Sequence, residues 1–579
     1  MWRPRRELPP AFGRSRCHAF PHNLHQLLPR PRTMARRILR TIIKVTLLSV
    51  VVGALLFILD TRFRVLPSSA DKYLHAFLPE HHDGHVVTDI TYLSCSRFGS
   101  CTLPQSEGWT RVEKDLNLGT GWVQRGYLFF KRKLETEFAP TKGEKVVVDI
   151  KISRLQPGAS EGAGEKSGAM WEQRPGSLWI KRQPKLSSEA ITAVEVLFGP
   201  DAHEVREGWV LKEGSLNVGE QPRITVRRGQ RVVPKRPQVM MGKDHKLKII
   251  QVSDLHLSTG VGHCREPAPP STAKNCEADP RTLDFLRRIL DDEKPDVAVL
   301  TGDQINGDTS PDVQTALFKF AEPFITRKIP FATILGNHDD ESVMTREQIL
   351  RLTAQLPYSL SEVGPEMGPI IKDSKGREVR EGGAGNYVVE VVAHNRAEHS
   401  ALTMYFLDSH SYSPDPDVDG YDWIKDYQID WFKKTATSLK DEHAKYTYIH
   451  LNMAFIHIPL PEYRKTGLPM VGGWREGVTA PAHNSGFRQA LVDAGVGVVS
   501  VGHDHANDFC KLDGLWMCYA GGSGFGGYGG YGDYIRRVRL FEIDAPTGRI
   551  KTWKRVEWED QGKIDMQTIV EGGKVVEQS

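Results

Sequence analysis

The stretch Lys246–His256, KLKIIQVSDLH, indicates the fold of the larger part of this chain. Its closely spaced apolar residues predict a buried strand over Lys246–Val252. Asp254 and His256 come directly after it and lie two positions apart, so both side chains leave the end of the strand in the same direction. A carboxylate oxygen and an imidazole nitrogen on one side suit a divalent metal. An Asp-x-His pair after a strand is more often a turn beside a surface histidine, so the metal interpretation depends on similar residues further along the chain.

Four further segments with the same character occur in order, each at the end of a predicted strand. They are Gly302-Asp303, Gly336-Asn337-His338-Asp339, His457 and Gly502-His503-Asp504-His505. Between these segments strands alternate with helices, which are predicted at 282–290, 312–326, 428–439 and 486–494. The alternation predicts an α/β domain over residues 243–557, and ligands of open α/β sheets bind beyond the carboxyl ends of the strands. We therefore expect the polar residues of these segments to meet at one edge.

The ordered blocks Asp-x-His, Gly-Asp, Gly-Asn-His-Asp, His and Gly-His-x-His resemble those of the calcineurin-like metallophosphoesterase superfamily. The longer segments around these blocks resemble those of the fungal and plant branch of the superfamily, which includes the fungal dosage-dependent cell-cycle regulator phosphatases. These segments are SDLHLSTG, LTGDQI, LGNHDDE, FIHIPLPEY and GHDHANDFC. The resemblance implies a four-layer αββα sandwich with mixed sheets. The chain departs from the related purple acid phosphatases at His256, which their first block lacks, and at Asn306, where they carry the tyrosine of the purple site.

The resemblance also implies a pair of divalent metal ions and a hydroxide that bridges them and attacks the phosphorus. On the matching positions, Asp303 bridges the two ions. One ion is held by Asp254, His256 and His505, and the other by Asn337, His457 and His503. Without a tyrosine at position 306 the choice among Mn, Fe and Zn stays open. His450 is an alternative to His457 because a strand predicted at 446–450 would end there, but the HIPLP segment around His457 matches the family block.

Two further residues are expected to take part in catalysis. His338 comes after the metal-facing Asn337, so we expect it to face the phosphate and to protonate the leaving oxygen. Asp339 or Asp340 is the candidate to orient its ring.

Two substrate contacts are predicted on weaker signals. Arg475, in GGWREG, is the candidate for a phosphate-facing cation, and a solvated loop arginine is the alternative. Tyr528 lies in a glycine- and tyrosine-rich run at 521–532, which is either a loop over the phosphate site or a plain turn.

The resemblance, together with these residues, implies a metal-dependent phosphatase that hydrolyses phosphomonoesters, with phosphoproteins as candidate substrates. The N-terminal segment described next adds the expectation that this phosphatase is membrane-anchored. A phosphodiesterase or nucleotide pyrophosphatase could use the same site. A non-catalytic scaffold with this fold is the alternative from another class, and it is disfavoured because none of the ligand positions has been lost.

The N-terminal 60 residues differ in composition from the rest. The net charge of +4 over 579 residues gives no indication of nucleic-acid binding, and the basic excess is local, because 8–59 contains no Asp or Glu. We expect a disordered basic tail at 1–40 and a transmembrane signal-anchor at 41–60. The positive-inside rule then predicts a single-pass protein with a cytosolic N-terminus and a catalytic domain in the lumen of the secretory pathway. A mitochondrial membrane is the alternative.

Six cysteines lie after the predicted anchor in three close couples, whose local spacing favours the disulfides Cys95–Cys101, Cys264–Cys276 and Cys510–Cys518. Oxidised pairs would fit a luminal or extracellular compartment, and six reduced thiols are the alternative. Strand-like runs bounded by turn residues predict a β-rich accessory domain at 86–240. Residues 558–579 are expected to form a loose C-terminal tail.

Overall fold

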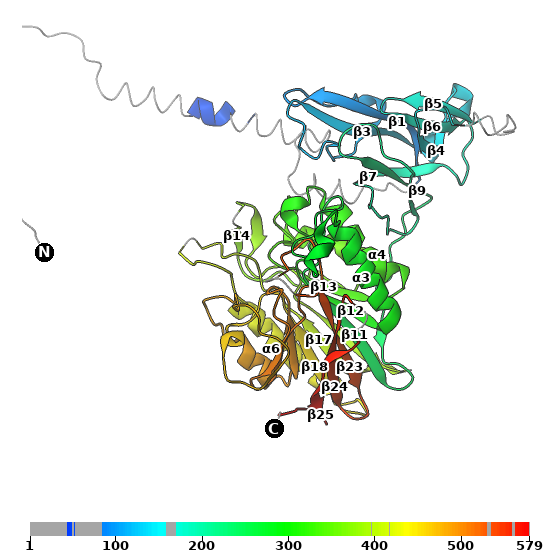
Figure 1. Cartoon of the computed structure of the whole chain (residues 1–579). Coiled ribbons are helices and arrows are strands. Elements are labelled where there is room, and N and C mark those ends of the chain that lie inside the picture. Colours follow the sequence, from blue (N-terminus) through cyan, green and yellow to red (C-terminus); the bar gives the residue numbers. More distant parts are fainter. Residues whose placement is uncertain are drawn as a thin grey trace, which may run out of the picture. The chain divides into compact units, whose positions relative to one another are not determined.

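The computed structural model describes residues 43–48, 51, 84–157, 169–373, 375–394, 396–415, 417–529, 534–558 and 562–577. The chain divides into two compact units, Met1–Ser69 and Ala70–Ser579. The second unit contains both the β-rich region and the α/β region (Figure 1). The basic tail predicted at 1–40 lies outside the described residues.

The predicted anchor at 41–60 is described only at residues 43–48 and 51, which are helical. A membrane-spanning helix needs about 20 predominantly apolar residues. In the described parts of the chain, no helix combines the length and the apolar character that crossing a bilayer requires. This finding contradicts the prediction of a single-pass membrane protein with a cytosolic N-terminus and a luminal catalytic domain, and with it the mitochondrial alternative.

Two mixed β-sheets form the centre of the α/β region (Figure 1). The first has seven strands in the order β13-β12-β11-β23-β24-β25-β26, with β11, β12 and β13 parallel to one another. Its bounds are β11 Lys246–Val252, β12 Val297–Thr301, β13 Phe331–Ile334, β23 Arg537–Asp544, β24 Arg549–Val556, β25 Ile564–Glu571 and β26 Lys574–Val575.

The second sheet has eight strands in the order β10-β16-β17-β18-β20-β22-β21-β19, with β17, β18, β20 and β22 parallel. Its bounds are β10 Val239–Met240, β16 Tyr387–Ala393, β17 Arg396–Phe406, β18 Leu451–Phe455, β19 Met470–Val471, β20 Val498–Val501, β21 Cys510–Leu512 and β22 Trp516–Tyr519. A separate hairpin joins β14 Ile370–Lys372 to β15 Glu378–Arg380.

Helices cover the outer faces of both sheets, so the region has four layers. The first sheet packs on α3 Ala278–Glu293, α4 Val313–Thr326 and α5 Arg346–Thr353, and the second on α6 Asp426–His443 and α7 Phe487–Asp493. The burial of β11 explains its apolar sequence: Leu247 and Ile249 lie in the core between the sheets, whereas Ile250 and Val252 pack in the helical layer. The mixed-sheet α/β fold that the resemblance implied is confirmed.

The described residues of the region from 85 to 228 form three small antiparallel sheets around their own apolar core. Their orders are β1-β3-β2, β4-β6-β5 and β7-β9-β8. The bounds are β1 His85–Ser96, β2 Trp109–Arg111, β3 Gln124–Leu134, β4 Val146–Ile152, β5 Met170–Arg174, β6 Leu178–Gln183, β7 Ile191–Phe198, β8 Trp209–Leu211 and β9 Pro222–Arg228.

A buried ion pair attaches this β-rich region to the start of α4. Lys114 Nζ lies 2.8 Å from Asp312 Oδ1 and donates to Gln314 Oε1 at 2.6 Å. Asp312 is also the N-cap of α4, because its side chain accepts the N–H of Thr315 at 3.1 Å. One carboxylate therefore both caps the helix and neutralises a cation from the neighbouring region.

The C-terminal segment is more ordered than expected. Where a loose tail was predicted at 558–579, β25 pairs with β24 and extends the first sheet. Its sequence, IDMQTIVE, alternates apolar and polar residues at 564–567, but Met566 is exposed, and the adjacent Ile569 and Val570 are the residues that enter the core between the sheets. The sequence pattern of residues 564–571 alone does not show that the carboxyl end of β25 is buried.

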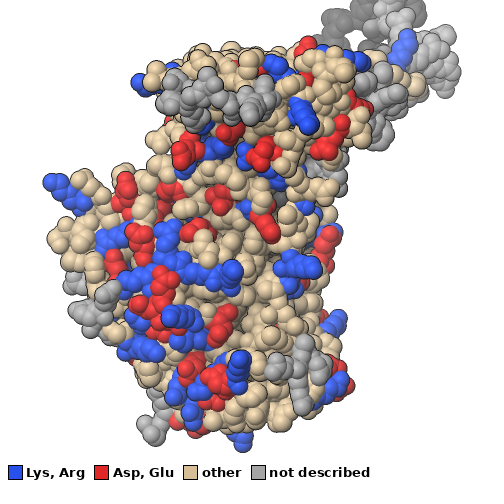
Figure 2. All heavy atoms as spheres, turned by 90° about the vertical axis from the view of Figure 1, so that its right-hand side faces the viewer, with Lys and Arg blue, Asp and Glu red and all other residues tan. Residues whose placement is uncertain are grey.

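The six cysteines form the three disulfides expected from their spacing: Cys95–Cys101, Cys264–Cys276 and Cys510–Cys518. On the face of the molecule drawn in Figure 2, the Lys and Arg side chains that the structure describes are interspersed with Asp and Glu. They do not gather there into the basic patch that is typical of nucleic-acid binding.

Lys114→Met is expected to lower the free energy of unfolding by about 3–5 kcal/mol, because it leaves a buried carboxylate without its cation. Denaturant unfolding followed by intrinsic fluorescence measures the change. The matched control is Lys133→Met, which breaks a pair with Glu144 whose side chains are 33% and 28% exposed and should change the free energy of unfolding far less, because solvent screens the pair. Equal effects of the two variants would contradict the role given to Lys114.

Candidate metal centre

The predicted site residues lie at the carboxyl ends of five parallel strands from the two sheets. Asp254 and His256 follow β11, Asp303 follows β12, and Asn337 and His338 follow β13 in the first sheet. In the second sheet, His457 follows β18, and His503 and His505 follow β20. Asp254, His256, Asp303 and His503 have left-handed backbones, with φ of 57°, 49°, 53° and 79°. Such backbone strain in non-glycine residues is concentrated at functional sites.

The first group of possible metal ligands consists of Asp254, His256, Asp303 and His505, all of them buried. Each offers one ligand atom, and these atoms all lie within 4.8 Å of one another. The Nε2 atoms of His256 and His505 are 3.0 Å apart, and His505 Nε2 is 3.6 Å from Asp254 Oδ1. These side chains therefore converge on one small volume.

The second group consists of Asp303, His457 and His503, which are also buried. His457 Nε2 lies 3.3 Å from Asp303 Oδ2 and 3.3 Å from Asn337 Oδ1. The Asn337 amide oxygen therefore joins this group. Asp303 belongs to both groups, so its single carboxylate can serve two neighbouring ions.

The surroundings of these side chains fit divalent metal ions. The Nδ1–H of His457 donates to the Thr301 carbonyl at 2.7 Å, and that of His505 donates to the Tyr528 carbonyl at 2.8 Å, so Nε2 is the ring nitrogen that each histidine presents to the cluster. His503 Nε2 and Asn337 Nδ2 are buried without a hydrogen-bond partner among the described residues. A set of imidazole, carboxylate and amide donors suits Mn, Fe or Zn.

Burial dominates the electrostatics of the cluster. It raises the pKa of Asp254 to about 7 and lowers the pKa of His256 to about 3, because both charged forms lose hydration. Burial also raises the pKa of Asp303, but the positive charge of His457 outweighs it and holds that pKa well below its usual value. Bound cations would favour both the carboxylates and the neutral imidazoles.

His338 stands beside this cluster and is not part of either ligand group. Its backbone N–H donates to Asp303 Oδ1 at 2.8 Å, and its ring centroid is 5.1 Å from that of His256. Its Nδ1 is 2.8 Å from Glu341 Oε2. Burial lowers the pKa of His338, but the carboxylates of Glu341 and Asp303 outweigh it and raise the pKa to about 9. The imidazole is therefore protonated at neutral pH.

Glu341, and not the predicted Asp339, is the carboxylate that faces the His338 ring. Asp339 is buried, and its oxygens accept the backbone N–H groups of Asp303, Ile305 and Gly336 at 2.7–2.9 Å. It ties the loop after β13 to the loop after β12. Three consecutive acids, Asp339 to Glu341, come after the histidine, and the sequence carries no signal that separates their roles.

The structure gives Tyr528 a different set of partners from the predicted substrate contact. Its ring stacks on His505 with the centroids 3.9 Å apart, and its hydroxyl accepts the His505 N–H at 2.9 Å and donates to Glu476 at 3.0 Å. These contacts position His505. Arg475 is exposed, and its guanidinium carbon lies 5.8 Å from the ring centroid of Tyr534.

The alternative histidine at position 450 belongs to a different part of the domain. The strand β18 begins at Leu451 and does not end at His450, so His450 lies at the opposite end of the strand from the cluster. Its ring stacks on His443 with the centroids 3.5 Å apart. His457, two residues beyond the carboxyl end of β18, is the histidine that reaches the cluster.

A tyrosine pair that borders the cluster had no signal in the sequence. The Tyr421 ring packs edge-on against His503 with the centroids 4.5 Å apart, and Tyr412 stacks on Tyr421. Ser411 donates its hydroxyl to the Asn337 carbonyl at 3.1 Å. Ser411 and Tyr412 also line a cavity of about 280 Å³, whose walls include neither His338 nor any residue of the two ligand groups.

Comparison with known proteins identifies the family. Residues 247–507 match the family model described as calcineurin-like phosphoesterase. The chain is also 40% identical over 403 residues to phosphatase DCR2 of Saccharomyces cerevisiae, an alignment that covers 66% of this chain and 67% of that protein. The chain belongs to the calcineurin-like phosphoesterase family. Membership and the phosphatase relative make it a phosphoric ester hydrolase, as predicted.

A plant relative of this calcineurin-like phosphoesterase carries a contrasting name. The chain is 38% identical over 344 residues to probable inactive purple acid phosphatase 29 of Arabidopsis thaliana, an alignment that covers 56% of this chain and 86% of that protein. The predicted branch, fungal phosphatases together with plant purple-acid-phosphatase-like proteins, is therefore confirmed. The inactivity is part of the plant protein's name, whereas both buried ligand groups are complete here.

Gly527→Ala is expected to weaken metal binding, because a Cβ at this position would lie 2.5 Å from both His256 Cδ2 and His505 Cε1 and would push the rings apart. Metal content after dialysis against graded chelator measures the affinity. Gly477→Ala is the control, since its Cβ would meet nothing within 4 Å. A Gly527→Ala protein that retains its metal as tightly as the control would contradict the assignment of both rings to one ion.

Proposed function

We propose that this chain is a metal-dependent phosphomonoesterase with a dinuclear centre. The shared position of the Asp303 carboxylate in both ligand groups carries the proposal. Asp303 is the bridging ligand, and the terminal ligands are Asp254, His256 and His505 for one ion and Asn337, His457 and His503 for the other. When bound, the two divalent ions would supply an activated water and positive charge for the phosphoryl group.

His338 is the general acid of the proposed reaction. Its Nδ1 faces Glu341, so Nε2–H is available to the oxygen of the leaving group. The Glu341 carboxylate favours the protonated ring, and a protonated leaving group departs as an alcohol instead of an alkoxide. Asp339 contributes indirectly, because it holds the loops that carry Asp303 and His338 in register.

The cavity at Asp340, Ser411 and Tyr412 supports an ester with a sizeable organic part. Its volume of about 280 Å³ offers room for a side chain or a peptide segment, and its walls adjoin the segments that carry Asn337 and His338 without including either residue. We therefore propose phosphorylated proteins as a candidate substrate class. The metal pair is proposed to come from Mn, Fe and Zn, since Asn306 provides no tyrosinate for a purple ferric site.

We also propose that the chain is organised as an accessory domain at 86–240 and a phosphoesterase domain at 243–557. The separate apolar core of the β-rich region supports this division. The Lys114–Asp312 ion pair gives the accessory domain a role in holding the start of α4.

The proposal is tested by assaying the purified, Mn-loaded chain on p-nitrophenyl phosphate, on bis(p-nitrophenyl) phosphate and on a phosphoserine peptide. We expect turnover of the two monoesters and little turnover of the diester. Asp303→Asn serves as the inactive control and should release at least one ion. Preference for the diester would indicate a phosphodiesterase, and two tightly bound ions without turnover of any ester would indicate a scaffold.

His338→Ala is expected to retain both ions and to slow turnover of the phosphoserine peptide by about 10²–10⁴-fold. The loss on p-nitrophenyl phosphate should be smaller, because p-nitrophenolate is a good leaving group that needs no proton. Steady-state kinetics on both substrates, with metal analysis of the same samples, measures the difference. Equal losses on the two substrates together with loss of metal would contradict the general-acid role.

Glu341→Gln is expected to shift the basic limb of the pH profile of kcat to lower pH. The general acid acts in its protonated form, and the Glu341 carboxylate raises the pKa of His338. Removing that charge lowers the pKa, so the proton is lost earlier as the pH rises. Glu347→Gln is the control, since Glu347 pairs with Arg351 on the surface of α5. An unchanged basic limb in Glu341→Gln would show that the pair does not govern this titration.

A further inference from the structure

The loop that carries His256 is held by a buried lysine of α4. Lys319 is fully buried, and its ammonium group contacts three oxygens from three separate segments. It donates to the Gly260 carbonyl at 2.6 Å, to Asp279 Oδ2 at 2.7 Å and to Asp201 Oδ2 at 2.6 Å. Because an ammonium group has three N–H donors, these contacts use all of them. The position of the ammonium group is therefore fixed from three sides.

Two of these oxygens belong to the α/β region and one belongs to the β-rich region. Gly260 lies four residues after His256 in the loop that follows β11, and Asp279 lies in the first turn of α3. Asp201 comes shortly after β7 of the β-rich region. Lys319 therefore joins the β-rich region to the loop after β11.

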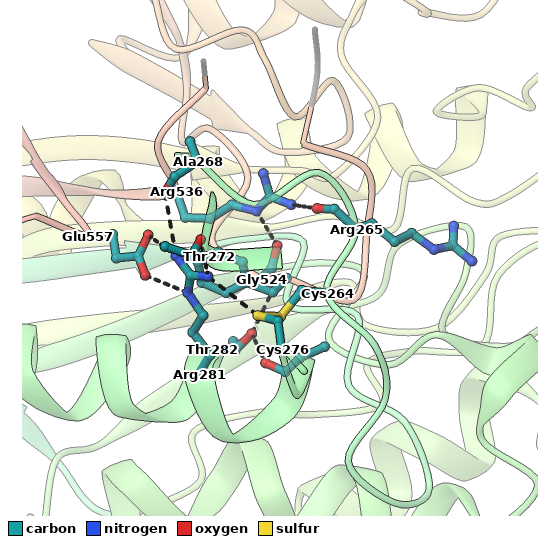
Figure 3. The surroundings of a disulfide bond; sticks show 12 residues. Cys264, Arg265, Ala268, Thr272, Cys276, Arg281, Thr282, Gly524, Arg536 and Glu557 are labelled. Atoms are coloured by element: carbon teal, nitrogen blue, oxygen red, sulfur yellow. Dashed lines mark hydrogen bonds and ion pairs between the residues drawn. A yellow bond between two sulfur atoms is a disulfide. The ribbon is translucent and has the colours of Figure 1, made fainter. Parts of the chain in front are cut away.

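A disulfide bond holds Asp279 beside the same loop. It joins Cys264, in the loop after β11, to Cys276, which comes two residues before α3 (Figure 3). The N–H of Asp279 donates to the Val261 carbonyl at 2.9 Å, and Asp279 Oδ2 accepts the N–H of Ser258 at 2.9 Å. The carboxylate that contacts the buried lysine therefore also holds the main chain two positions after the metal-facing histidine.

A second buried lysine leads from the β-rich region to the same loop. Lys114 Nζ lies 2.8 Å from Asp312 Oδ1. The main chain of Asp312 in turn holds Thr259, whose hydroxyl accepts the Asp312 N–H and donates to the Asp312 carbonyl, both at 3.1 Å. The contacts of Lys114 and Lys319 therefore both reach the three consecutive residues 258–260.

The β-rich region also packs directly on this loop. Gly199 follows β7, and a Cβ added to it would lie 3.0 Å from the Cα of Gly260. Leu197 and Ala202, on either side of Gly199, belong to the same apolar cluster as Leu257. Main-chain contact, apolar packing and ion pairs thus act on the same short segment.

We propose that Lys319 and Asp201 are positioning residues for His256. Through them the β-rich region contributes to the binding of the ion that is assigned to this histidine, an inference that rests on the proposed dinuclear centre. His256 is buried and has a left-handed backbone, so the direction of its ring depends on how the main chain after it is held. Its Nε2 must stay in the small volume that it shares with His505 Nε2, 3.0 Å away. Contacts outside the ligand set fix the orientation of metal ligands in this way.

Competition with a graded chelator, measured on the full chain without turnover, tests the proposal. Asp201→Ala should weaken the binding of one of the two ions by about tenfold, at the lower end of the usual effect of contacts outside a ligand set. The other ion should bind as in the wild type. Asp201→Asn retains an oxygen acceptor and should weaken the same ion less. Lys319 keeps Asp279 and Gly260 in both variants, so the fold should be retained.

Reference variants show which release step belongs to which ion, and a matched control removes a comparable ion pair. His505→Ala marks the ion assigned to His256, and His503→Ala marks the other. Glu322→Gln is the control, because Glu322 lies on α4 three residues after Lys319 and pairs with Arg287 of α3 at 2.7 Å. The Glu322 side chain is 16% exposed, compared with 14% for Asp201. This control should leave the binding of both ions unchanged.

Two results would overturn the proposal and leave the dinuclear centre standing. One is unchanged binding of both ions in Asp201→Ala, and the other is an equal loss for both ions, which would indicate general loosening of the fold. A wild-type chain that fails to bind two ions would instead overturn the proposed centre, and this inference with it. Because the wild type and the variants are measured in the same assay, the two failures are distinguishable.

Gly199→Ala tests the direct contact with the loop without a change of charge. The added Cβ would approach both the Gly260 Cα and Asp201 Oδ1 at 3.0 Å, so the turn after β7 must move away from the loop. We expect weaker binding of the same ion as in Asp201→Ala. Gly208→Ala is the control: φ is +87° at Gly199 and +80° at Gly208, where the nearest atom to the added Cβ is 3.8 Å away. Equal losses of metal affinity in the two glycine variants would contradict a positioning role of the turn, because backbone strain alone would explain them.

Discussion

The Asp303 carboxylate is the contact on which the site depends, because it lies within reach of ligands from both sheets. His256 comes from the first sheet and His457 from the second, and their Nε2 atoms lie 3.7 Å and 3.3 Å from Asp303 Oδ2. The spacing of the sheets at this edge is therefore part of the site. Gln251 helps to set it, since its amide donates to the Val501 carbonyl and accepts from the Ser500 hydroxyl across the core.

The cluster gathers buried groups whose charged forms are costly to desolvate. The fold compensates with fixed backbone donors: Asp254 accepts from the His503 N–H, and Asp303 from the His338 N–H. Left-handed backbones at several ligand positions add strain that the packed sheets on either side must hold. The packing of the two sheets thus provides the stability that offsets the polar, strained cluster at the ends of their strands.

A second level of contacts sets the orientation of the ligands. The ring of Tyr528 stacks on His505, and the main-chain carbonyl of Tyr528 accepts the Nδ1–H of His505. The main-chain carbonyl of Thr301 accepts the Nδ1–H of His457 in the same way. Asp339 gathers backbone N–H groups from two loops. The glycine run around Gly527 allows the chain to pass against two imidazoles.

The sequence by itself determined the family, the α/β fold and the residues that converge at the strand ends, because strand periodicity and strand-end motifs are local and ordered along the chain. Its short cysteine spacings also favoured the three disulfides that the structure contains. Only the tertiary structure decided which acid faces His338, what Tyr528 contacts, and that residues 564–571 form a strand. It also showed no helix in the described residues that could cross a membrane, against the predicted anchor. Contacts such as those of Glu341 with His338 and of Tyr528 with His505 depend on distances between side chains, and no sequence pattern encodes them.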